Sequence, residues 1–186
     1  MSIERTRFWL VSIASLLAVS LFAGDAFASS FSIIYTFQGG SDGAYPQPPL
    51  LDIGGTLYGA TQAGGGSGGT NCNSFGCGTV FSITPTGAEK IIYSFQDGSD
   101  GKYPGSLFKA DNSIVGDSQN DNEVTTTLFS LTTKGKFNVL AQNAGLMQAG
   151  SAMTKVSKTY YGVVGGDHQF TNCENAACGY VYAYTP

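Results

Sequence analysis

The chain has little positive charge, and it has no arginine after its first few residues. Its only two arginines are Arg5 and Arg7, and 9 lysines and arginines stand against 13 aspartates and glutamates, for a net charge of −4. A protein that binds nucleic acid needs a basic surface that neutralises phosphates. The composition therefore argues against nucleic acid as a partner.

Groups that commonly perform catalysis are also scarce. The chain has a single histidine, His168. A histidine beside an aspartate can act as a general base, but His168 has no nucleophile in its own repeat and is typical of an exposed loop. We therefore predict no catalytic residue and no cofactor, and an enzyme is the less favoured reading.

Long apolar runs are missing except at the start, where residues 1–28 have the pattern of a secretory signal peptide. Arg5 and Arg7 precede an uncharged apolar run, Phe8–Phe22, and Ala26–Ala28 forms a small-x-small cleavage site. The alternative, a membrane anchor, would need roughly 20 apolar residues. We expect cleavage after Ala28 and a secreted protein, either extracellular or periplasmic, with no membrane span after cleavage.

No amphipathic helix period is visible in residues 29–186, which contain short aromatic and β-branched runs separated by glycine-rich turns. One phrase recurs, as Leu57-Tyr58-Gly59 and as Tyr160-Tyr161-Gly162, each followed by a loop and a second aromatic strand. The spacing predicts a single all-β repeat domain of about three four-stranded antiparallel units. The units cover approximately 49–95, 106–141 and 150–184.

The third unit is one strand short, and the segment 31–37 has the pattern of the missing strand. We predict that this N-terminal strand completes the last unit, as in a β-propeller, where such closure hides sheet edges. Propellers have about 4 to 8 blades, so three units either close as a monomer or pair with a second chain as a homodimer. A β-trefoil is the alternative fold.

The repeated phrases resemble the GloVer tandem repeat of bacterial extracellular repeat proteins. The resemblance rests on Leu57-Tyr58-Gly59, Gly64-Gly65, Gly78-Thr79-Val80-Phe81, Tyr93-Ser94-Phe95 and Asp100-Gly101-Lys102-Tyr103-Pro104, and it is specific over about 31–107. It implies secretion and a propeller-like fold, and it implies no catalytic residues. The chain departs from the family in its short length and its degenerate second half.

Four cysteines lie in two pairs of identical spacing, Cys72 with Cys77 and Cys173 with Cys178. Each pair falls in the equivalent loop of a unit, so the repeat favours two local disulfides, which export would allow to form. A four-cysteine zinc site is the alternative. We predict the disulfides and no bound metal.

Two repeated turns carry the candidate binding residues, Asp42 with Tyr45 and Asp100 with Tyr103. The aspartates could bind a calcium ion through their carboxylate oxygens, or they could cap a turn. The tyrosines could stack on sugar rings, or they could cover the end of a blade. We expect a non-catalytic binding or surface-associated module whose partner is an extracellular glycan or a cell-surface component. The alternatives are an extracellular carbohydrate-active enzyme of propeller type and an inert structural repeat fragment.

Overall fold

The computed structural model describes residues 30–66, 72, 74–111, 113–119, 125–144, 153–167 and 178–185. The chain divides into two units, Met1–Ser32 and Ile33–Pro186, and every strand found among the described residues belongs to the second. The predicted signal peptide lies outside the described residues. Within the described ranges, we find no apolar helix of the length that a bilayer crossing requires.

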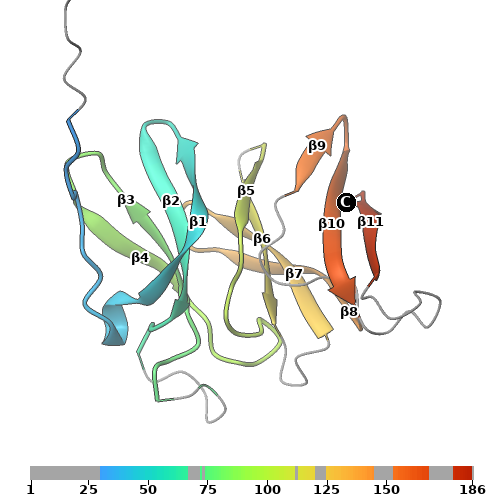
Figure 1. Ribbon diagram of the computed structural model, residues 1–186, viewed down its shortest axis with the longest axis horizontal. Helices are drawn as coiled ribbons and strands as arrows, with labels where there is room; N and C mark the ends of the chain where they lie inside the picture. Colours follow the sequence, from blue (N-terminus) through green and yellow to red (C-terminus); the bar gives the residue numbers. More distant parts are fainter. Residues whose placement is uncertain are drawn as a thin grey trace, which may run out of the picture. The chain divides into compact units, whose positions relative to one another are not determined.

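The second unit is all-β and contains three antiparallel sheets that follow one another in chain order (Figure 1). The first sheet has four strands: β1 (Ala44–Ile53), β2 (Thr56–Ala63), β3 (Thr79–Ile83) and β4 (Glu89–Ser94). The second sheet also has four: β5 (Leu107–Ala110), β6 (Ser113–Gln119), β7 (Thr125–Thr132) and β8 (Phe137–Ala144). The third sheet has three: β9 (Thr154–Val156), β10 (Thr159–Asp167) and β11 (Cys178–Tyr184).

Each sheet is a simple meander, because every strand pairs with the next one along the chain. This arrangement confirms the predicted all-β class and the division into units of consecutive antiparallel strands. Before the first sheet, the described residues 30–43 form only a single 3-10 turn, η1 (Gly40–Asp42).

A glycine opposite an aromatic ring explains the recurring Tyr-Gly phrase. The cross-strand pairs are Gly59 with Phe81, Gly116 with Phe129, and Gly162 with Tyr182. A Cβ added at any of these glycines would lie 2.3–2.7 Å from the partner ring, far inside van der Waals contact. The ring of each third strand therefore lies directly over the glycine of the second strand, and a larger residue would displace it.

The sheets pack face to face through two apolar clusters. One joins the first and second sheets and includes Tyr58, Val80, Phe95 and Phe129. The other joins the second and third sheets and is formed by Phe108, Ala110, Val115, Leu128, Met153 and Tyr160. Burial of these side chains is the main force that holds consecutive sheets together.

The predicted N-terminal closing strand is wrong in this structure. Residues 33–37 form no strand, and among the described residues β11 pairs only with β10. The segment contacts the first sheet instead, since the ring of Phe37 lies 4.9 Å from that of Phe81 in an edge-on arrangement. The segment therefore covers the beginning of the repeat and not its end.

The first unit was expected to begin at about residue 49, but β1 starts before Pro46, Pro48 and Pro49. β1 begins at Ala44 and includes all three prolines. Proline cannot donate a ladder hydrogen bond and is tolerated on an edge strand. β1 is the edge of the first sheet, and its pairing with β2 is irregular between Gln47 and Leu51.

Candidate functional site

A pocket of about 250 Å³ lies at one end of the first sheet, and it contains two of the four predicted binding residues. Its lining consists of Tyr45, Gln62, Ala63, Phe75 and Tyr103. Tyr45 and Phe75 are 64% and 66% exposed, so their rings are available to a ligand. The structure therefore brings the two repeated tyrosines together in one place.

Both tyrosines have an unusual backbone conformation. The φ angle is 56° at Tyr45 and 52° at Tyr103, in the left-handed region. For a bulky residue this conformation costs on the order of 1–2 kcal/mol. Such strain is concentrated at ligand sites and is kept only where the surroundings impose it, which favours a binding role for this pair.

Tyr103 is held by its own backbone and by the preceding lysine. Its amide N–H donates to the Cys77 carbonyl at 2.7 Å. The ammonium of Lys102 lies 5.6 Å from the centroid of the Tyr103 ring and pairs with Asp97 at 3.5 Å. Because Lys102 is itself buried, its position is fixed, and the ring beside it is fixed as well.

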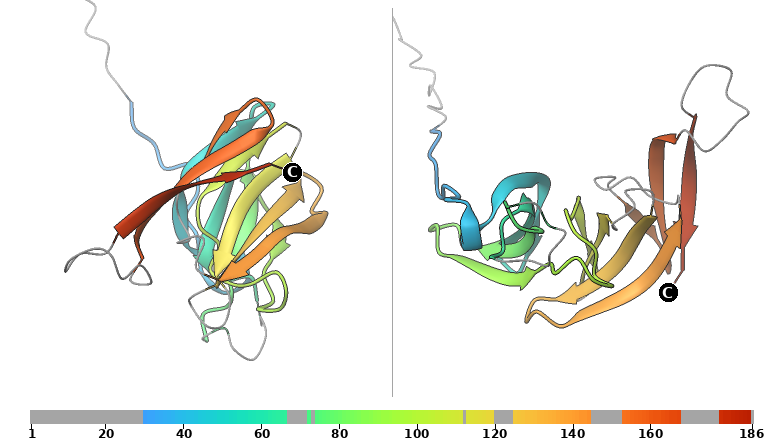
Figure 2. Two further views of the ribbon diagram at one scale, coloured as in Figure 1. Left: turned by 90° about the vertical axis from the view of Figure 1, so that its right-hand side faces the viewer. Right: turned by 90° about the horizontal axis from the view of Figure 1, so that it is seen from below.

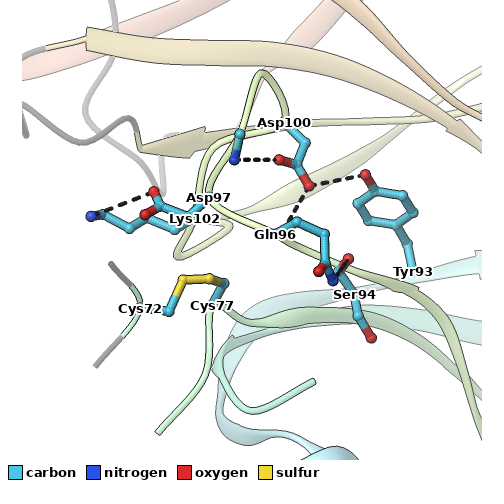
Figure 3. Close-up of a disulfide and its surroundings, with 9 residues drawn as sticks. Cys72, Cys77, Tyr93, Ser94, Gln96, Asp97, Asp100 and Lys102 are labelled. Atoms are coloured by element: carbon cyan, nitrogen blue, oxygen red, sulfur yellow. Dashed lines mark hydrogen bonds and ion pairs between the residues drawn. A yellow bond between two sulfur atoms is a disulfide. The ribbon is translucent and has the colours of Figure 1, made fainter. Parts of the chain in front are cut away.

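The loop between β2 and β3 supplies the third aromatic ring. A disulfide joins Cys72 to Cys77, as predicted (Figure 3). In the loop that this bridge closes, the Phe75 carbonyl accepts a hydrogen bond from the Gly64 N–H at 2.6 Å. The bridge and this hydrogen bond together hold Phe75 at the pocket. Cys173 lies outside the described residues, as does the side chain of Cys178, so the second predicted bridge is not described.

The two predicted aspartates do not line the pocket, because they cap the turns that lead into it. Asp100 is 6% exposed. It accepts hydrogen bonds from the Tyr93 hydroxyl at 3.0 Å, the Gln96 N–H at 2.9 Å and the Gly98 N–H at 2.9 Å (Figure 3). Three donors on one carboxylate close the turn between β4 and β5.

Asp42 repeats this arrangement one unit earlier. It accepts a hydrogen bond from the Tyr35 hydroxyl and another from the Gln38 N–H at 2.5 Å. The bond to Asp42 raises the pKa of Tyr35 to about 12. Burial, together with the charge of Asp100, raises the pKa of Tyr93 as well, so both tyrosines stay protonated as donors at neutral pH.

These contacts bear on the metal alternatives. The oxygens of Asp42 and Asp100 are directed at N–H and O–H donors, and a calcium ion would have to displace those donors. Within the described ranges, no three His, Cys, Asp or Glu side chains gather as a metal site. His168 lies outside the described residues.

The sequence did not identify Gln62, Ala63 and Phe75 as members of the site. Phe75 carried one available signal, since it is the large apolar residue between two cysteines in a loop of glycine and polar residues. Its contact with Gly64 is non-local and could not be read from the chain.

A scan against protein-family models found no match to the chain, and a search of curated proteins found no relative.

Proposed function

We propose that this protein is a secreted, non-catalytic binding module, and that its pocket receives a sugar ring of an extracellular glycan. The observation that carries the proposal is the convergence of Tyr45 and Tyr103, equivalent in the repeat and both left-handed, with Phe75 around one pocket. Aromatic faces provide flat apolar surfaces, and tyrosine adds a polar tip. The amide of Gln62 can donate to and accept from a hydroxyl.

A binding role is favoured over catalysis by the state of the carboxylates. A glycosidase commonly uses two carboxyl groups flanking the scissile bond. Asp42 and Asp100 instead accept hydrogen bonds inside their own turns, and neither lines the pocket.

The extracellular location and the propeller-type architecture belong to the same proposal. The Cys72–Cys77 bridge is compatible with an oxidising, extracellular location. Stacked antiparallel meanders support propeller-type blades over a β-trefoil. We also propose membership of the GloVer-type repeats, since the Gly-aromatic pairs give the shared phrases a structural reason.

The test is binding to a panel of bacterial and plant polysaccharides and their oligosaccharides, followed by calorimetry with the best ligand. We expect Tyr45→Ala and Phe75→Ala each to weaken binding by about tenfold, equivalent to roughly 1.4 kcal/mol. Tyr45→Phe is the matched control, because it keeps the ring and removes only the hydroxyl.

The remaining results each decide against the proposal. Equal losses in Tyr45→Phe and Tyr45→Ala would exclude ring stacking. Turnover of any polysaccharide would favour the enzyme. An absence of binding across the panel would favour an inert repeat.

A further inference from the structure

Each sheet of the repeat has a leading face, which is the side turned toward the next sheet along the chain. On the first sheet this face carries Tyr58, Ala60 and Val80, which are 8%, 1% and 0% exposed because the second sheet covers them. On the second sheet it carries Val115 and Leu128, which the third sheet covers. A following sheet is therefore what buries a leading face in this protein.

The third sheet has the same apolar leading face with nothing described over it. The residues equivalent to Tyr58, Ala60 and Val80 are Tyr161, Val163 and Val181. They are 42%, 55% and 70% exposed. Val156 of β9 adds a further exposed side chain, at 58%. Such a contiguous apolar surface marks an interaction site.

A segment at the other end of the repeat resembles the outer strand of a sheet, but no described strand pairs with it. Residues 33–38 match residues 91–96 except that Thr36 stands in place of Ser94. Residues 91–94 belong to β4, the outer strand of the first sheet. Residues 33–38 also repeat the contacts of residues 91–96. Tyr35 packs edge-on against Phe37 at 5.1 Å, and Tyr93 packs edge-on against Phe95 at 5.2 Å.

The backbone contacts agree. The Ile34 carbonyl lies over the Gly87 turn, so that a Cβ there would be 2.3 Å away, and the Ile92 carbonyl lies over the Gly135 turn at 2.7 Å. Residues 33–38 thus contact the first sheet as β4 contacts the second. Within the part of the chain that the structure describes, no strand pairs with them as β3 pairs with β4, and Ile33 is 74% exposed.

We propose that the leading face of the third sheet binds a second copy of this chain. The first sheet of that copy covers Tyr161, Val163 and Val181, and its segment 33–36 adds a fourth strand to β11. The partner is a second copy because the chain itself supplies both surfaces of the interface. One is the leading face of the third sheet, and the other is the first sheet with the segment 33–36. Two such chains satisfy each other reciprocally, which gives a closed two-fold dimer with no open edge at the joint.

The register of the new strand pair follows from the existing one. β3 pairs with β4 through Val80 with Tyr93 and Thr79 with Ser94. The equivalent pairs between copies are Val181 with Tyr35 and Tyr180 with Thr36. Figure 2 shows β11 at the outside of the third sheet, where an added strand would lie.

The first experiment is the mass of the exported, purified protein by light scattering over a range of concentrations. We expect a dimer, and we expect Val181→Glu to weaken its association at least tenfold by placing a charge on the covered face. Val139→Glu is the matched control, since Val139 is 41% exposed but lies on β8 of the second sheet, and this variant should remain dimeric. A monomer in the wild type, or equal weakening by both variants, would overturn the proposal.

The second experiment tests the register by cysteine crosslinking. Chains carrying Thr36→Cys are mixed with chains carrying Tyr180→Cys under mild oxidation, and we expect a crosslinked dimer only in the mixture. Either variant alone is the control for the native cysteines. A chain carrying both substitutions that crosslinks only within itself would show closure of a monomer and contradict the second copy, as would oligomers longer than two.

Discussion

The carboxylate of Asp100 is the part of the site whose removal has the most definite cost. Asp100→Ala deletes three hydrogen bonds, from the Tyr93 hydroxyl and from the N–H groups of Gln96 and Gly98. A hydrogen bond to a charged group contributes about 1.5–3 kcal/mol, but the two amides are part-buried and regain bonds to water. We therefore expect a loss of roughly 3 kcal/mol in the free energy of unfolding, which lowers Tm by about 6–12 °C for a domain of this size.

The assay is urea unfolding followed by far-UV circular dichroism, with the equivalent Asp42→Ala as the matched control. Asp42 accepts only two bonds, and its Gln38 donor is exposed, so we expect a loss of about 1 kcal/mol or less. A loss in Asp42→Ala that equals or exceeds that in Asp100→Ala would refute the argument from burial. The same assay with calcium or a chelator should give unchanged midpoints, and stabilisation by calcium would show that these carboxylates bind the ion.

Three further changes test other parts of the molecule. Replacing Cys72 and Cys77 together by serine should lower the free energy of unfolding by about 2 kcal/mol and weaken pocket binding, because the bridge closes the loop that lines the pocket; unchanged calorimetric affinity would contradict this. Burial, aided by a neighbouring carboxylate, raises the pKa of Glu89 above its ordinary 4.5, so its contribution to stability is complete below that value and is lost as pH rises through the raised value. Glu89→Gln should therefore raise Tm at neutral pH and leave it unchanged near pH 3, a difference that thermal unfolding at the two pH values would measure. Gly116→Ala places a Cβ 2.7 Å from the ring of its cross-strand partner and should cost about 1–3 kcal/mol, whereas Gly98→Ala, whose nearest atom is 3.5 Å away, should shift the unfolding midpoint less.

The strands of the first two sheets could be predicted because local pattern and local structure coincide there. The runs around Leu57 and Phe81 alternate or are continuously apolar between glycine turns, and each pairs with its neighbour in sequence. The N-terminal segment has the same local pattern, and the prediction failed because pairing depends on which strand lies alongside. That is a property of the assembled sheets and not of residues 31–37.

The site was predictable to the extent that it repeats. Tyr45 and Tyr103 were found because the same turn occurs twice, and the structure places both at one pocket. Their aspartates were found by the same repetition, although their role is to cap the turns. Phe75 was missed because its position depends on a disulfide and on a hydrogen bond to Gly64, neither of which leaves a periodic trace in the sequence.

The match between residues 33–38 and β4 has a consequence for how such chains change length. The structural module does not begin where a sheet begins, because the outer strand of one sheet is the element that contacts the next. A module therefore runs from one Tyr-x-Phe segment to the following one, about 38–95 in this chain. An additional copy of that stretch would make the same contacts at both of its ends that the existing modules make. Duplication or loss of whole modules would therefore change the number of sheets and leave the interfaces between them chemically the same.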